Sequence, residues 1–252
     1  MKSSILALSK KVLKGFGILL FWVALWYVVA IFTGQELLVP TPLKTLSVLT
    51  EFISKGSFWF AVLLSTLRII SGFLLGVLIG VLGGILSVKS KVFDALTSPV
   101  LRIARAVPVV SFILLAYVWI KTNFIPIFIT ALMVAPIIWA TVMVGIRGID
   151  KSLVEMGKVF RLSKKDIFFK IKFPQVAPAF VSACLTTLGL AWKSGVAAEV
   201  ICYPERSLGR LLHNASTYLE TPETFALTFV VVLISLALEK LVKFVAKRWA
   251  SV

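Results

Sequence analysis

Residues 122–146, TNFIPIFITALMVAPIIWATVMVGI, run for 25 positions without one charged side chain. About 20 residues of apolar helix are enough to cross the roughly 30 Å hydrocarbon layer of a bilayer. The run lacks the period-two alternation of apolar and polar residues that a strand of a membrane barrel would have. Because lipid offers the backbone no hydrogen-bond partner, we interpret this stretch as a transmembrane helix.

The rest of the chain has the same character. Hydrophobic residues make up 59% of its 252 positions and charged residues 15%, and its mean hydropathy is +1.00, which excludes a soluble protein. Further apolar runs cover about residues 16–33, 59–88, 106–120, 176–202 and 222–238. The run at 106–120, the third along the chain, has Pro108 in its first turn. We therefore predict an all-α polytopic membrane protein with six transmembrane helices, forming a single transmembrane domain over residues 1–252.

The net charge of +16 indicates an orientation rather than a nucleic-acid partner. With the N-terminus inside, four basic residues precede the first span, four lie in 89–105, eight in 147–172 and four from Lys240 onward. Only five lie outside, namely Lys44, Lys55, Lys121, Arg206 and Arg210. This asymmetry follows the positive-inside rule, and no nucleic-acid motif or soluble basic face accompanies it. Both termini are predicted to be cytoplasmic.

Two periodic patterns predict helix packing. Apolar residues recur at helical spacing between residues 43 and 53, after the turn signal Pro40-Thr41-Pro42. This predicts a short helix on the outer face, which either seals the rim of the bundle or receives a partner. In the second span, glycines recur at every fourth position, which lets another helix backbone approach closely; they are Gly72, Gly76, Gly80 and Gly84.

The sequence offers no catalytic or metal-binding set. Cys184 and Cys202 would lie about 27 Å apart on one helix, so they cannot form a disulfide, and His213 stands alone. Gly157-Lys158 is followed by Val159 and lacks the upstream glycine of a phosphate-binding loop. The residues for a nucleophile elbow are absent as well. We expect a transport protein, not an enzyme.

The longest inner loop contains LVEMGKVFRLSKKDIFFKIKFPQVAP at residues 153–178. Apolar residues of its first half share a helical face, and Ser163 followed by Asp166 is a plausible N-cap of a second helix bearing Ile167, Phe168 and Ile171. Two short amphipathic helices on the cytoplasmic side would form a docking ridge. A simpler alternative is that the lysines only set the topology or bind anionic lipid.

This loop resembles the hallmark of the binding-protein-dependent ABC importer permeases, in the nitrate, sulfonate and taurine branch. That hallmark is Glu-Ala-Ala, three variable residues and Gly, then a Leu-Pro or similar pair about a dozen residues later. Glu155-Met156-Gly157 stands for the triplet and Phe173-Pro174 for the closing pair, whereas Arg161 departs from the usual Gly. Similar motifs at 39–42, 105–108 and 191–199 extend the resemblance over about residues 37–245.

The resemblance implies a type I-like ABC importer permease fold in a bacterial cytoplasmic (inner) membrane. It implies a second copy as homodimer partner, a dimer of ABC ATPase subunits and an extracytoplasmic substrate-binding protein. The chain itself would carry no cofactor, because the partner ATPase binds ATP and Mg. The ATPase would dock on the coupling loop, residues 147–177, through Glu155, Gly157, Phe160, Arg161, Leu162 and Pro174.

Three charges fall inside the predicted spans: Arg68, Lys193 and Glu199. Such residues usually face a partner or a watery cavity. We predict an ion pair between Arg68 and Glu199, which share the outer half of the membrane. Lys193 either binds an anionic substrate or has a structural role, near a helix end or reaching toward the interface. With Ser194, Pro108 and Ser111, these three residues are candidates for the translocation path.

Other classes of membrane protein stay open at this stage. A secondary transporter or channel could also have six helices and buried charges, and it would have no ATPase partner. A membrane assembly protein is a third class. The sequence mildly favours an anion such as a sulfonate or nitrate as the substrate, but it does not identify the compound or decide whether the permease dimer is homomeric.

Overall fold

The computed structural model describes the backbone of residues 2–250 and the side chains of residues 15–244, and this part of the chain contains helices and no strand. The helices are α1 (Lys2–Thr33), α2 (Pro42–Ser54), α3 (Gly56–Lys89), α4 (Lys91–Ala106), α5 (Val109–Trp119), α6 (Ile125–Arg147), α7 (Lys151–Val159), α8 (Lys164–Asp166), the π-helix η1 (Ile167–Lys172), α9 (Phe173–Cys202), α10 (Leu208–Thr217) and α11 (Thr221–Ala250). Some basic side chains used in the orientation prediction lie outside the described side chains: Lys2, Lys10, Lys11, Lys14, Lys247 and Arg248.

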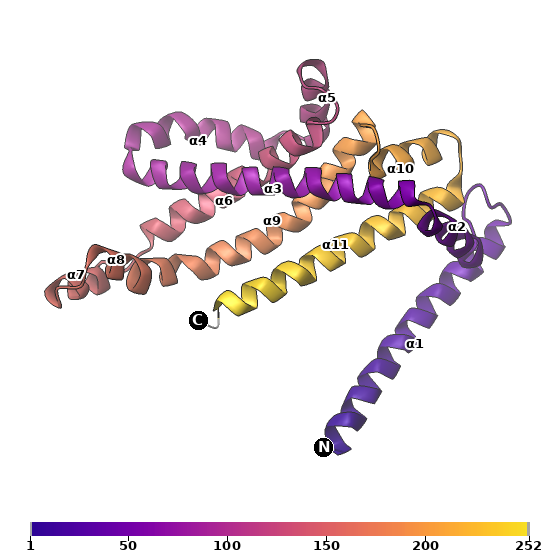
Figure 1. Cartoon of the computed structure of the whole chain (residues 1–252), viewed down its shortest axis with the longest axis horizontal. Helices are drawn as coiled ribbons and strands as arrows, with labels where there is room; N and C mark the ends of the chain where they lie inside the picture. The colour runs from indigo at the N-terminus through magenta and orange to yellow at the C-terminus, as the bar shows by residue number, and fades with distance from the viewer. Residues whose placement is uncertain (1, 251–252) are drawn as a thin grey trace. The chain divides into compact units, whose positions relative to one another are not determined.

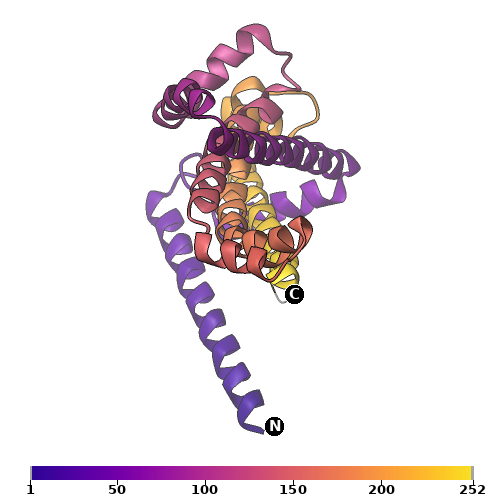
Figure 2. The same cartoon turned by 90° about the vertical axis from the view of Figure 1, so that its left-hand side faces the viewer.

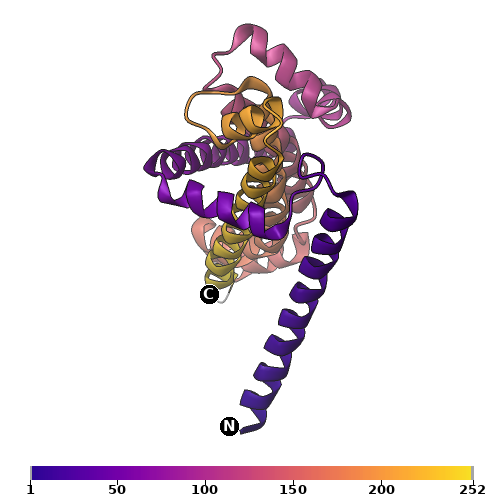
Figure 3. The same ribbon diagram turned by 90° about the vertical axis from the view of Figure 1, so that its right-hand side faces the viewer.

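The predicted all-helical membrane class is confirmed. Among the described residues, five helical segments are long and apolar enough to cross a bilayer: Gly15–Thr33, Gly56–Lys89, Ile125–Arg147, Lys164–Cys202 and Thr221–Phe244. The helix expected near residues 43–53 is also present as α2, and Thr41 caps its N-terminus by accepting a hydrogen bond from the Lys44 N–H. Figure 3 shows the loop that leads from α1 into α2.

The prediction that the third span is a single helix was wrong. We expected one helix with its core between Ala106 and Ile120, but α4 ends at Ala106 and α5 has only 11 residues. A helix of that length rises about 16 Å, which is too short for the membrane. The residue before a proline is driven out of the helical region, so Val107 is extended ahead of Pro108 and the two helices meet at 107°. The bend is visible in Figure 1.

Together, α4 and α5 nevertheless extend from one end of α6 to the other. Asp94, near the start of α4, forms a 2.7 Å ion pair with Arg147, the last residue of α6. At the far end Asn123, two residues before α6 begins, accepts a 3.2 Å hydrogen bond from Arg68. Since α6 has 23 residues and rises about 34 Å, residues 94–123 make the same passage. Counted as one broken span, α4 and α5 bring the total to six.

The described chain forms two compact units, Met1–Trp59 with Leu211–Val231 and Phe60–Arg210 with Val232–Val252. In the first unit, the Trp26 ring stacks between Phe225 and Phe229, with ring centroids 5.8 and 5.7 Å apart. The Thr221 hydroxyl donates a 2.6 Å hydrogen bond to the Leu37 carbonyl. These contacts join α1 and the loop after it to the start of α11.

In the second unit, the glycine face of α3 packs on α6, as its spacing predicts. A Cβ atom at Gly76 would lie 2.8 Å from Val134 Cβ, and one at Gly80 would lie 2.7 Å from Ile138 Cβ. Gly72 and Gly84 meet α6 equally closely. In a membrane, where lipid is as apolar as leucine, close backbone approach of this kind is a main source of helix association.

Helix α6 is the centre of this unit. It packs along α9 for most of its length, and Ile113 and Ala116 of α5 join Ala198 and Cys202 of α9 in a fully or almost fully buried cluster. At its other end, the Trp139 ring of α6 stacks on Phe93 of α4 at 5.7 Å. Contacts at the two ends of α6 thus position the segments that precede and follow this helix.

Candidate functional site

Helix α7 starts from a cap that also ties it to α9. Asp150 accepts hydrogen bonds from the Ser152 N–H at 2.8 Å and from the Ser152 hydroxyl at 2.7 Å. These bonds stabilise the ionised carboxylate and hold the pKa of Asp150 below its ordinary value. The Asp150 N–H donates to the Gln175 side chain at 2.9 Å. The entry of the loop is therefore anchored on the helix that follows it.

Arg161 ends α7 in the left-handed conformation, with a φ of 52°. The Arg161 N–H bonds the Lys158 carbonyl and the Leu162 N–H bonds the Gly157 carbonyl, both at 2.9 Å. This is the Schellman motif, in which this position is usually glycine because a Cβ atom disfavours positive φ. The bend expected of the family is present although the residue is arginine. Among the described residues, Arg161 forms no ion pair.

Gly157 has a packing role. It is buried, and a Cβ atom there would lie 2.8 Å from Ile171 Cδ1 and 3.4 Å from Ile167. This close approach seats α7 against η1. Gly157 therefore does not belong to the exposed face of α7.

The exposed face of α7 is apolar at its C-terminal end. Met156 is 49% exposed, Val159 80% and Phe160 73%, and Leu162 beyond the bend is 38% exposed. Glu155, Arg161 and Pro174 are exposed as well. A cluster of large apolar side chains at the surface is typical of a contact with another protein or with the membrane. Figure 2 shows this loop at the near end of the unit.

The second helix of the loop differs from the prediction. Ser163 is the N-cap as expected, since its hydroxyl accepts a 3.1 Å hydrogen bond from the Asp166 N–H. The helix it opens is not a separate short element, because α8, η1 and α9 form one helical segment from Lys164 to Cys202. Pro174 explains the π-turn: it lacks an N–H and its ring would clash with the carbonyl four residues earlier, and a wider turn relieves that clash.

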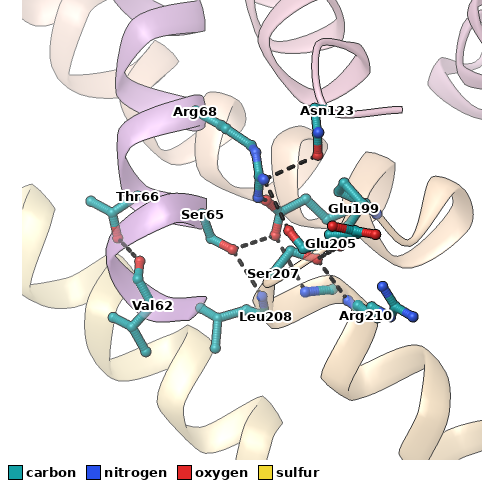
Figure 4. A network of polar contacts seen from close by, with 12 residues as sticks. Val62, Ser65, Thr66, Arg68, Asn123, Glu199, Glu205, Ser207, Leu208 and Arg210 are labelled. Atoms are coloured by element: carbon teal, nitrogen blue, oxygen red, sulfur yellow. Dashed lines mark hydrogen bonds and ion pairs between the residues drawn. The ribbon is translucent and has the colours of Figure 1, made fainter. Parts of the chain in front are cut away.

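The predicted ion pair between Arg68 and Glu199 is present. Their side chains approach to 3.4 Å, with Glu199 fully buried and Arg68 13% exposed. The other oxygen of Glu199 accepts hydrogen bonds from the Ser65 hydroxyl at 2.6 Å and from the Gly209 N–H at 3.3 Å. Gly209 lies in the first turn of α10, whose positive dipole end favours a carboxylate. Figure 4 shows the carboxylate enclosed by these donors.

Arg68 connects this cluster to two loops. Its guanidinium donates to the Asn123 side chain at 3.2 Å and to the Glu205 carbonyl at 3.0 Å. The Ser65 hydroxyl also accepts from the Leu208 N–H at 2.8 Å. Every polar atom of the Glu199 carboxylate therefore has a partner inside the protein, which makes Arg68 and Glu199 a structural clamp between α3, α9 and α10.

The six path candidates do not form one site. Ser194 is 5% exposed and its hydroxyl donates to the Ala191 carbonyl, so it belongs to the buried face of α9. Pro108 and Ser111 are exposed at the bend between α4 and α5. Lys193 is exposed on α9 and has no hydrogen-bond or ion-pair partner among the described residues. The structure thus separates Lys193 from the Arg68–Glu199 clamp.

Several residues of these sites were missed by sequence reasoning. The exposed Met156 and Val159 had a detectable signal, since both are large apolar residues on a short polar loop helix. Ser65, Asn123 and Gly209 had none, because each meets Glu199 or Arg68 only in the folded chain. In the described part of the chain, no group of three His, Cys, Asp or Glu residues could hold a metal ion.

Solved structures share the fold of this chain. An amino acid ABC transporter matches with a TM-score of 0.63 at 17% identity, covering 82% of this chain and 97% of that one. The MetNI methionine ABC transporter matches with a TM-score of 0.54 at 18% identity, covering 77% and 92%. At such low identity these likenesses establish the fold alone, that of the membrane subunits of ABC transporters.

The sequence comparisons identify the family. The model of the "binding-protein-dependent transport system inner membrane component" family matches residues 72–251, and the chain belongs to that family. The nitrate import permease protein NrtB of Synechococcus elongatus is 30% identical over 243 residues, covering 90% of this chain and 85% of that one. The bicarbonate transport system permease protein CmpB of Synechocystis is 27% identical over 199 residues, covering 77% and 70%. The chain is a permease subunit of an ABC importer.

Proposed function

We propose that this subunit imports a small anion, with ATP hydrolysed by a separate pair of ABC ATPase subunits that hold the ATP and Mg. The names of the relatives support the substrate class, because NrtB is named for nitrate and CmpB for bicarbonate. Two copies of the chain would enclose the path in a bacterial inner membrane. An extracytoplasmic binding protein would deliver the substrate to the outer face.

The ATPase assignment rests on the apolar end of α7, which is exposed although the helix itself is firmly attached to the rest of the protein. Phe160 and Val159 lie outside the protein's own core, while Gly157 and Asp150 fasten α7 to the helical segment Lys164–Cys202. A displacement of α7 would therefore be transmitted directly into a membrane-spanning helix. This is the connection that an ATP-driven permease needs between nucleotide hydrolysis and the path.

The test is co-purification of the chain with a co-expressed ABC ATPase from the same organism, followed by ATP-dependent uptake of nitrate, bicarbonate and a sulfonate in proteoliposomes. We expect Phe160→Ala to weaken ATPase binding at least tenfold, because alanine removes the largest exposed apolar group of the loop. Phe32→Ala is the matched control, since Phe32 is 87% exposed at the end of α1, outside the loop. Uptake that needs no ATPase would instead identify a secondary transporter or channel.

A further inference from the structure

Helix α9 has one exposed face that is polar although it lies within a membrane-spanning segment. Ser182, Thr186 and Lys193 are exposed, and a Cβ atom at Gly189 would meet nothing within 4 Å. Steps of three and four residues place these four positions on one side of the helix. The Thr186 hydroxyl donates to the Ser182 carbonyl on the same helix. We call this set the Lys193 face.

The outward face of α3 shows what a lipid-facing surface of this protein looks like. Leucines at steps of four and seven residues are each more than half exposed there: Leu67, Leu74, Leu78 and Leu82. The Lys193 face replaces these leucines by hydroxyls, a glycine and a charge. A lipid environment would leave that charge without solvation, so the Lys193 face requires water or a polar partner.

Lys193 cannot obtain that water by reaching the membrane surface. It lies nine residues before the end of α9 at Cys202, about 14 Å along the helix, which is close to half of a roughly 30 Å hydrocarbon layer. The four-carbon stem of lysine is too short to span that distance. Snorkelling, which serves lysines near helix ends, is therefore not available to Lys193.

Among the residues whose side chains the structure describes, no carboxylate pairs with Lys193 either. Glu199 on the same helix is fully buried and paired with Arg68, Ser65 and Gly209. If a second copy presents the same face, it brings another Lys193 and no acid. Two lysines facing each other attract an anion between them and repel one another without it.

We propose that the Lys193 face lines a water-filled translocation path and that Lys193 is the group that attracts the anionic substrate within the membrane. This inference rests on the proposed function, because it assumes that the path carries an anion between two copies. It assigns to Lys193 a role that Arg68 cannot have, since the guanidinium of Arg68 is already bound to Glu199, Asn123 and Glu205.

The test measures local charge at Gly189, where a new side chain has free space. The substitution Gly189→Cys is introduced into a chain that also carries Cys184→Ala and Cys202→Ala. The complex assembled with this chain is placed in proteoliposomes, and its reaction rates with an anionic and with a cationic methanethiosulfonate reagent are measured. Position 189 is one helical turn from Lys193, about 6 Å away. A unit charge at that distance in water changes the ratio of the two rates about tenfold. We expect that preference for the anionic reagent, and we expect Lys193→Met to abolish it.

Leu78→Cys on the leucine face of α3 is the control, and it should react with neither reagent. A Gly189→Cys that stays unreactive in a complex that retains its ATPase would overturn the proposal, because the face would then be covered by lipid or protein. A preference that survives Lys193→Met would also overturn it. Loss of ATPase binding by the unmodified chain is a separate result, which would contradict the proposed function rather than the assignment of the Lys193 face.

Discussion

Arg161 keeps a backbone conformation that glycine would adopt more easily. A left-handed residue with a Cβ atom costs about 1–2 kcal/mol, and Arg161 has a φ of 52°. Its side chain is exposed and forms no ion pair among the described residues, so no ion pair in that part of the chain offsets this cost. Backbone strain is retained mainly at functional sites, so we propose that the Arg161 side chain contributes to the proposed contact with the ATPase.

We therefore expect Arg161→Gly to stabilise the isolated permease by about 1 kcal/mol, because the strain is relieved, and to weaken its binding to the ATPase. Thermal unfolding in detergent and co-purification measure the two effects separately. Arg161→Ala is the control that removes the side chain and keeps the Cβ atom. If Arg161→Gly drives uptake as well as the parent does, the arginine side chain adds nothing to coupling.

The Arg68–Glu199 clamp predicts a strongly coupled pair of substitutions. Removing one partner of a buried ion pair usually costs about 3–5 kcal/mol, because the other charge is left uncompensated. Glu199→Gln and Arg68→Gln should each reduce the yield of assembled complex and its thermal stability. The double variant should lose less than the sum of the two, since neither charge remains alone. Strictly additive losses would contradict an ion pair.

At the scale of elements, the contact between α3 and α6 depends on the absence of side chains. A Cβ atom at Gly80 would lie 2.7 Å from Ile138 Cβ and 2.8 Å from the Ala135 carbonyl oxygen. Both neighbours belong to α6, and one is backbone that cannot rotate away. Even a methyl group must therefore separate the two helices.

We predict that Gly80→Ala lowers the stability of the permease by about 1–3 kcal/mol, the usual cost of overpacking. The matched control is Gly189→Ala, which adds the same methyl group to α9 where nothing lies within 4 Å. Guanidinium or thermal unfolding of both variants in the same detergent gives the comparison. Equal effects at the two glycines would show that helix propensity, not packing, governs the result.

Under the proposed function, the segment from Lys164 to Cys202 would carry a movement of α7 to the far end of the protein. Its π-turn, Ile167–Lys172, accommodates Pro174 without interrupting the helix. The end of the segment beside α7 and its end beside α10 therefore belong to one continuous helix. Glu199, at the far end, holds the first turn of α10 through Gly209. A movement of α7 is thus connected to the clamp by a single element.

At the scale of the whole molecule, the orientation in the membrane follows from charge. Twenty basic residues would lie inside and five outside if both termini are cytoplasmic. We expect a fluorescent protein fused to the C-terminus to fold and fluoresce, and alkaline phosphatase fused after Arg206 to be active, since that loop would lie outside. The reverse pattern would place α7 on the outer side and would contradict ATPase docking there.

The apolar runs in the sequence predicted the helical membrane fold, because burial in lipid depends on the composition of each segment by itself. The capping residue Ser163 and the glycine face of α3 were also predicted, since each is a pattern of neighbours along the chain. Local patterns did not reveal where α4 ends or that the helix after Ser163 continues to Cys202. Those outcomes depend on how a proline is accommodated in three dimensions.

The amino-acid sequence by itself therefore determined the membrane environment of this protein and the class of its fold. The pairing of Arg68 with Glu199 was predicted, but only the tertiary structure decided that Ser65, Asn123 and Gly209 complete it. Arg68 and Glu199 are distant in the chain and both lie in apolar spans, yet one pair of contacts places them in a clamp and leaves Lys193 outside it. Hydropathy is a sum over adjacent residues, whereas the partner of a buried charge is set by the packing of helices that are far apart in sequence.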